Sequence, residues 1–231
     1  MSQAKKVFTR MCLNNWGGID HKVLEFHEYV NLFSGKSGSG KSTVMDAIQV
    51  ILYGSFSPSF LNKAADDAKN RRSVLSYLRG EQKDGSANRK DCDFCSVIAL
   101  EIEDTGTHII TCIGIAFEVR KSDSEIKKFV YFSHSGKMPE SEYLTEQGVC
   151  YSNQEIKKLV SARTKSDDNR GKGEVNRIYG SKEAYLGTLY DVILGYIDQN
   201  RFITMEKSAI ALKMTNGTGQ FIRDYMFPKN T

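Results

Sequence analysis

The sequence lacks any run of about 18 to 20 uninterrupted apolar residues, the length that a membrane-spanning helix needs. Its start, MSQAKKVFTR, is basic, but the apolar stretch of a secretion signal does not follow it. These two absences argue against a membrane protein and against a secreted one. We therefore expect a cytoplasmic protein with no membrane partner.

Cysteine is scarce and irregularly spaced. The five residues are an odd number, which argues against a disulfide framework and fits a reducing compartment. Cys92 and Cys95 form a C-x-x-C pair, half of a zinc or redox site. No second pair or flanking histidine completes it, and Cys95 leads into the apolar run SVIALEIE, so ordinary strand packing is the favoured interpretation.

A strong excess of one charge is also missing. The 32 basic residues exceed the 28 acidic ones by only four, too few to indicate nucleic-acid binding alone. The segment from Lys63 to Lys90 holds eight basic and four acidic residues, an excess equal to that of the whole chain. A solvated loop is the common reason for such a run, and DNA contact is the alternative.

The strongest positive signal is a glycine-rich segment that fits the phosphate-binding pattern G-x-x-x-x-G-K-[ST]: Gly35, Lys36, Ser37, Gly38, Ser39, Gly40, Lys41 and Ser42. The glycines let successive N–H groups point at phosphate oxygens, and the following helix adds the positive end of its dipole. Lys41 is placed to reach the β- and γ-phosphates, and the Ser42 hydroxyl to ligate Mg²⁺. With Thr43 as a further contact, the segment predicts binding of ATP with Mg²⁺.

Hydrophobic periodicity around this motif predicts an α/β domain with an added antiparallel β-meander. We expect strands at 7–15, 21–35 (turning near 27–29), 95–103, 107–120 and 127–135, with a hairpin at Asp104-Thr105-Gly106. We expect helices at 41–53, 64–78, 153–163 and 181–197, the first two ended by Gly54 and Gly80. The polar stretch 164–176 predicts a mobile loop.

The carboxylate that hydrolysis would require is not evident. A P-loop enzyme needs an acid at the end of a neighbouring strand. One group of candidates, Glu101, Glu103 and Asp104, follows the alternating pattern of an exposed strand face. The other candidate, Asp198, ends a run with helical spacing. The sequence therefore predicts half of an active site, which binds ATP but does not hydrolyse it unaided.

The stretch VNLFSGKSGSGKSTVMDAIQVILYG resembles the loop and first helix of the SMC (structural maintenance of chromosomes), RecF and SbcC group. Within that group the chain is similar to the SMC-like subunit of the Wadjet plasmid-defence system (JetC), a relative of MukB. The motifs that carry this likeness are LNNWGG, LNKAA, SVLSYLRGE, SVIALEIED, IGIAFEV, AIALKM and QFIRDYMF. The resemblance implies that residues 1–231 are the N-terminal, Walker A lobe of an ABC-type SMC ATPase head. A coiled coil and a C-terminal half with the signature motif and Walker B acids would follow.

The resemblance also implies partners and further site residues. Two heads would dimerise around ATP in a DNA loop-extruding complex with kleisin, KITE and nuclease subunits, acting on circular double-stranded plasmid DNA. Lys41 and Gln220 would be catalytic, with Gln220 as the Q-loop glutamine that contacts Mg²⁺ and the attacking water. Arg79 stands where the group has an arginine that reaches nucleotide or DNA, although it also fits a surface position at a helix end. Ser37 replaces the usual asparagine, which we expect to tune binding rather than abolish it.

Two other classes of protein also fit a phosphate-binding motif. A self-contained small P-loop kinase or GTPase would bring its own acids or a base-reading motif, and Asn62-Lys63-x-x-Asp66 is one residue too long for the N/T-K-x-D of a GTPase. A nucleotide-sensing module would bind without turnover.

Overall fold

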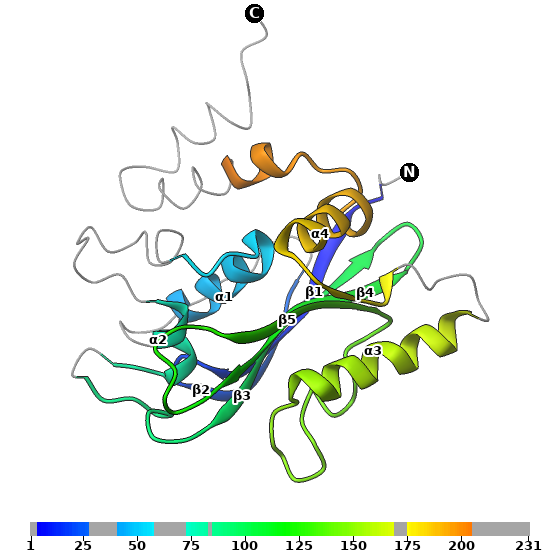
Figure 1. Cartoon of the computed structure of the whole chain (residues 1–231). Helices are drawn as coiled ribbons and strands as arrows, with labels where there is room; N and C mark the ends of the chain where they lie inside the picture. Colours follow the sequence, from blue (N-terminus) through cyan, green and yellow to red (C-terminus); the bar gives the residue numbers. More distant parts are fainter. Residues whose placement is uncertain (1–3, 28–40, 58–72, 83–84, 169–174, 205–231) are drawn as a thin grey trace, which may run out of the picture.

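An antiparallel sheet forms the centre of the computed structural model, which describes residues 4–27, 41–57, 73–82, 85–168 and 175–204 (Figure 1). The six strands follow the order β2-β1-β3-β4-β5-β6. Their bounds are β1 Lys6–Trp16, β2 Ile19–Glu25, β3 Phe94–Asp104, β4 Ile110–Val119, β5 Lys128–Ser135 and β6 Arg177–Tyr179. The mixed α/β architecture with an antiparallel meander, predicted from the sequence, is confirmed.

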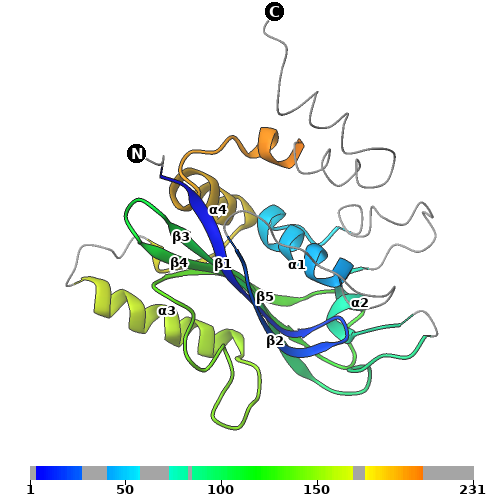
Figure 2. The same ribbon diagram turned by 180° about the vertical axis from the view of Figure 1, so that it is seen from behind.

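Helices cover both faces of this sheet (Figures 1 and 2). One face carries α1 (Lys41–Tyr53), α2 (Val74–Arg79), α4 (Lys182–Gly187) and a π-helix (Thr188–Ile193), and the other carries α3 (Asn153–Asp168). Covered on both sides, β3 is buried without interruption from Ser96 to Ile102. This explains why its sequence is a continuous apolar run rather than a strict alternation. None of the helices in the described ranges is long and apolar enough to cross a membrane.

Strand alternation sorts the side chains into two cores. Ile98 and Leu100 of β3 pack in the larger cluster with α1, α2 and α4. Val97 and Ala99, which point the opposite way, pack in a second cluster with Ile156 of α3. A side chain on β3 therefore faces either α1 or α3. Only acidic residues on the α1 side of the strand could contribute to a site at α1.

Four predicted elements differ from the structure. The strand expected at 21–35 is β2, which begins at Ile19 and ends at Glu25, and residues 28–35 lie outside the described ranges. Helix α3 continues to Asp168, so 164–168 is helical rather than a mobile loop, whereas 169–174 lies outside the described residues. Beyond that gap Asn176 is buried, donates from Nδ2 to Asp167 Oδ2 at 2.9 Å and accepts from the Ser135 amide at 2.8 Å. These hydrogen bonds tie the end of α3 to the sheet.

The other two differences concern helix boundaries. The helix expected at 64–78 is described only from Val74 onward, where Ser73 caps it by accepting from the Ser76 amide at 3.1 Å. The helix expected at 181–197 is α4 followed by a wider π-turn, in which the Leu194 amide donates to Leu189 O at 2.8 Å. The π-turn adds one residue per turn, and both Leu189 and Tyr190 are buried.

Tyrosine hydroxyl groups satisfy carbonyls in the last turn of α1 and just beyond it. Tyr185 donates to Ile51 O at 2.9 Å, Tyr190 to Leu52 O at 2.8 Å and Tyr131 to Gly54 O at 2.6 Å. The last carbonyls of a helix have no partner within it, so buried ones must find donors elsewhere. Burial raises the pKa of Tyr131 to about 12, so this hydroxyl keeps the proton that it donates.

Replacing Tyr185 with phenylalanine tests this capping. The variant keeps the ring but leaves Ile51 O without its donor, so we expect the free energy of unfolding to fall by about 1 to 2 kcal/mol. Urea denaturation followed by circular dichroism measures the change. Exposed Tyr196 offers the control, since Tyr196→Phe should alter stability by less than about 0.5 kcal/mol.

Candidate nucleotide-binding site

The predicted nucleotide site begins at the N-terminus of α1. Lys41 is the first residue of that helix, and Ser42 and Thr43 follow in its first turn. No acidic side chain lies in this turn, so no carboxylate there neutralises the positive end of the helix dipole. Gly35 to Gly40 and Gln220 lie outside the described residues, and their assignments stay predictions.

The β1–β2 turn packs directly against this first helical turn. The Trp16 indole Nε1 donates to Thr43 O at 2.9 Å, and the Trp16 side chain is fully buried. Gly17, with φ of 59°, lies so close that a Cβ added there would stand 2.6 Å from Thr43 Cγ2. Only glycine combines this left-handed backbone with the close approach. The turn thus contacts both the backbone and the side chain of Thr43.

Helix α2 joins the same contact through Tyr77. Its ring stacks on Trp16 with centroids 5.1 Å apart and planes 8° from parallel. Its hydroxyl donates to the carboxylate of Asp46, which is buried in the second turn of α1, and its carbonyl accepts from the Gly17 amide at 2.8 Å. One aromatic pair therefore links β1, α1 and α2.

Arg89 holds the other side of the β1–β2 turn. Its guanidinium is buried and donates to Leu78 O at 2.9 Å, to Gly17 O and to Asp20 Oδ1 at 2.8 Å. Burial lowers the pKa of Arg89, and the carboxylate of Asp20 opposes that change. Neither interpretation of the basic segment, a solvated loop or DNA contact, applies to Arg89, because its side chain is buried.

Arg79 is the last residue of α2 and is half-buried. Its Nη2 donates to the carbonyl oxygens of Lys121 (3.2 Å) and Asp123, in the turn that follows β4. The structure thus gives Arg79 partners within the chain, while its contact with nucleotide or DNA stays a prediction.

The acids considered for hydrolysis all have other partners. Glu101 is buried rather than exposed, which corrects the sequence-based expectation; it accepts from Thr9 Oγ1 at 2.8 Å and the Met138 amide at 2.9 Å. By strand parity it shares the α3 face with Val97 and Ala99, away from α1. Asp104 pairs with Lys6 Nζ at 2.8 Å, and Asp198 accepts from the Arg201 amide at 2.7 Å.

The Cys92–Cys95 pair shows no metal-binding arrangement. Cys92 is exposed, whereas Cys95 lies in β3, where burial raises its pKa to about 11. Across the described ranges, no three His, Cys, Asp or Glu side chains are grouped to hold a metal ion. Strand packing is therefore a sufficient account of Cys95.

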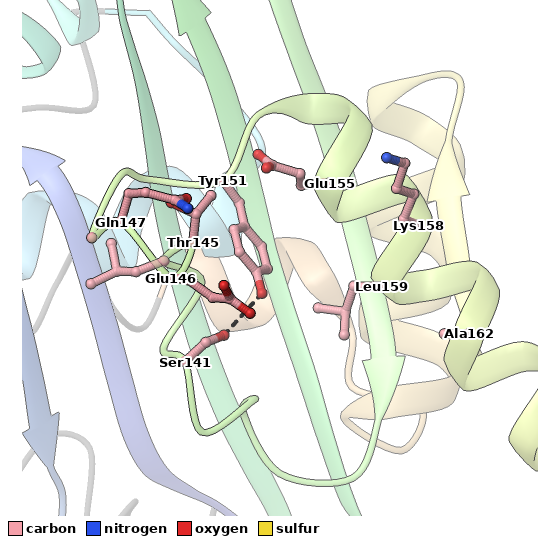
Figure 3. A pocket seen from close by; sticks show the side chains of 11 residues that line it. Ser141, Thr145, Glu146, Gln147, Tyr151, Glu155, Lys158, Leu159 and Ala162 are labelled. Carbon is pink, nitrogen blue, oxygen red and sulfur yellow. Dashed lines mark hydrogen bonds between the residues drawn. The ribbon is translucent and has the colours of Figure 1, made fainter.

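An open groove of about 920 Å³ lies on the opposite face of the sheet, between α3 and the loop 141–151 (Figure 3). Leu144, Tyr151 and Leu159 contribute its apolar lining, and Ser141 Oγ hydrogen bonds to the Tyr151 hydroxyl at 3.0 Å. Because α1 lies on the other face, the groove is separate from the predicted nucleotide site.

Comparison with known proteins finds a match for the segment around α1. Residues 8–68 match the family described as the P-loop containing region of AAA domain (AAA_29). The chain is also 34% identical over 74 residues to SbcC, a component of the nuclease SbcCD from Staphylococcus haemolyticus (strain JCSC1435), a match that covers 30% of this chain and 6% of that protein. This mixed α/β chain thus contains a segment that matches a P-loop region, and 74 of its residues are similar to SbcC.

Two solved structures are also similar at low identity. One comes from work on ATP-driven dimerization and DNA-stimulated activation of SMC ATPases, with 14% identity, a TM-score of 0.34, and coverage of 67% of this chain and 97% of that one. The other is the recombination mediator RecF with ATP, with 15% identity, a TM-score of 0.36, and coverage of 97% and 49%. TM-scores of this size do not establish a shared topology. The chain spans about half of the RecF chain and a small fraction of SbcC.

Proposed function

We propose that this chain is the ATP-binding N-terminal lobe of an SMC-like ATPase head. The observation that carries the proposal is that α1 begins at Lys41, immediately after a glycine-rich sequence, inside the segment that matches a P-loop region. A helix that starts at this lysine directs its unpaired N–H groups and its dipole toward whatever precedes it. Similarity to SbcC over 74 residues supports the same class of ATPase.

The residues at this helix end suit a magnesium–nucleotide complex. The first turn offers a cationic and a hydroxyl residue and no acid, a set that favours a polyphosphate anion. Residues 35–41 would hold the phosphates and Ser42 would ligate Mg²⁺. The bound ion would neutralise phosphate charge.

The candidate acids of this chain do not supply the carboxylate that hydrolysis needs, so other segments would complete the site. Among the described residues, the candidate carboxylates are engaged elsewhere, and Glu101 faces away from α1. We infer that the Walker B acids and the signature motif come from a C-terminal half and from a second head. Gln220 would contact Mg²⁺, and Arg79 would approach nucleotide or DNA.

The resemblance to the Wadjet protein supports a role in defence against plasmid DNA. In this proposal the heads dimerise on ATP, assemble with kleisin, KITE and nuclease subunits in the cytoplasm, and extrude DNA loops. Basic residues of the segment 63–90 other than Arg89 would neutralise DNA phosphates without reading bases.

Replacing Lys41 with alanine tests the nucleotide site. We expect ATP·Mg²⁺ binding, measured by isothermal titration calorimetry, to weaken by about 100-fold or more, because the variant loses the only side-chain cation of the first helical turn. Lys182→Ala is the matched control, since Lys182 opens α4.

Turnover by the isolated chain separates this proposal from its rivals. We expect little ATP hydrolysis by the wild-type chain despite binding. Robust Mg²⁺-dependent hydrolysis that Lys41→Ala abolishes would instead indicate a self-contained P-loop enzyme.

A further inference from the structure

Trp16 is the side chain that ties the sheet to the first turn of α1. Its indole N–H donates to Thr43 O at 2.9 Å, across 27 positions of sequence. Thr43 is two residues beyond Lys41, so the hydrogen bond fixes the backbone turn that carries both Lys41 and Ser42. The contact holds the helix end from outside, where helices otherwise tend to fray.

Tyr77 provides a second anchor one turn further along the helix. Its hydroxyl donates to the carboxylate of Asp46, and Asp46 lies on the same side of α1 as Thr43 because residues three apart are neighbours. The stacked rings of Trp16 and Tyr77 make the two anchors one rigid unit. Two attachment points define both the axis and the rotation of the helix end, which a single point would not.

Asp46 gives this unit an electrostatic role as well. It is a buried acid in the second turn of a helix whose start is expected to bind phosphates. A carboxylate free to swing toward the helix start would repel those phosphates. The hydrogen bond from Tyr77 holds it against α2 and partly offsets its charge.

We infer that Trp16 and Tyr77 are positioning residues of the nucleotide site, which set the placement of Lys41 and Ser42 against the phosphates. This inference rests on the proposed function, because it presupposes ATP binding at α1. Neither residue contacts the nucleotide in this scheme. Their effect acts through the orientation of the first helical turn, where small displacements are costly.

The test compares the two ends of the same helix in the full chain. Trp16→Phe keeps an aromatic ring but removes the donor to Thr43 O, at the start of α1. Tyr190→Phe removes a donor of the same kind to Leu52 O, at its end. We expect Trp16→Phe to raise the calorimetric Kd for ATP·Mg²⁺ about fivefold to tenfold and Tyr190→Phe less than about twofold. Thermal melts show whether the two variants are equally destabilised.

Tyr77→Phe is the second variant, which keeps the stack on Trp16 and removes the hydroxyl that donates to Asp46. We expect its Kd for ATP·Mg²⁺ to rise about fivefold as well. Because Trp16 is the only tryptophan in the chain, its fluorescence also reports directly on the first turn. We expect ATP·Mg²⁺ to change that emission in the wild type and in Tyr190→Phe, but not in Lys41→Ala.

The outcomes separate the inference from the proposed function. No calorimetric ATP binding by the wild-type chain would overturn the proposed function itself. Unchanged affinity in Trp16→Phe and Tyr77→Phe, with wild-type binding intact, would overturn only the positioning role. Equal affinity losses in Trp16→Phe and Tyr190→Phe would assign Trp16 to general stability and would also overturn it.

Discussion

Replacing Arg89 with alanine is expected to lower the free energy of unfolding by about 3 to 5 kcal/mol, because two buried carbonyl oxygens lose a charged donor. Leu78 O and Gly17 O both accept from this guanidinium. The aliphatic stem of Arg89 is buried as well, so its packing is lost with the charge. Urea denaturation at neutral pH measures the change.

The ion pair with Asp20 should contribute little of this effect. The Asp20 side chain is 81% exposed, so water screens its attraction to Arg89. Asp20→Asn is therefore the matched control, with an expected loss below about 1 kcal/mol. If Asp20→Asn and Arg89→Ala cost the same, the stabilisation would come from the ion pair and our assignment to the carbonyls would be wrong.

Acid should destabilise the protein through His134. This imidazole is buried, and burial lowers its pKa from 6.5 to about 4. Its Nε2 lies 2.9 Å from the Tyr143 hydroxyl and its Nδ1 lies 3.0 Å from Ser135 O, an arrangement that suits a neutral ring with the proton on Nδ1. In the unfolded chain His134 takes up a proton near pH 6.5, which the folded state resists.

This difference in pKa determines the direction in which the stability of the protein changes with pH. Stability from His134 is fully present above about pH 6.5 and is lost as the pH falls toward about 4. The loss between about pH 7 and about pH 4.5 amounts to roughly 2 kcal/mol. His134→Gln can still donate and accept but does not titrate in this range, so denaturation at both pH values should show a smaller acid loss in the variant. Equal acid losses in wild type and His134→Gln would contradict the prediction.

Local signals in the sequence were enough to predict strands β1, β3, β4 and β5 and helix α1, but not the short strand β6. The hairpin between β3 and β4 follows from Asp104-Thr105-Gly106, and α1 follows from its apolar spacing and from Gly54, which has φ of 55°. These features depend on neighbouring residues, so periodicity and turn chemistry capture them.

Features that depend on distant partners could not be predicted in this way. From the sequence, Arg89 looks like one more solvated cation in a basic run. Its acceptors are backbone carbonyls 11 and 72 positions away, which the local pattern does not reveal. Trp16 gave only a weak signal, a lone tryptophan before two glycines. Glu101 resembled an exposed alternating acid because the sequence does not show that α3 and the loop before it cover that face of the sheet.

The tyrosine hydroxyls at the end of α1 also bear on the order of folding. Tyr185 and Tyr190 donate to carbonyls 134 and 138 positions earlier in the chain. During synthesis α1 leaves the ribosome long before these donors exist. Its C-terminal carbonyls therefore lack their tyrosine partners until the 182–193 segment has been made. Such long-range closure slows folding and leaves apolar surface exposed meanwhile. We therefore expect a chain shortened before residue 182 to aggregate, although its phosphate-binding motif would be intact.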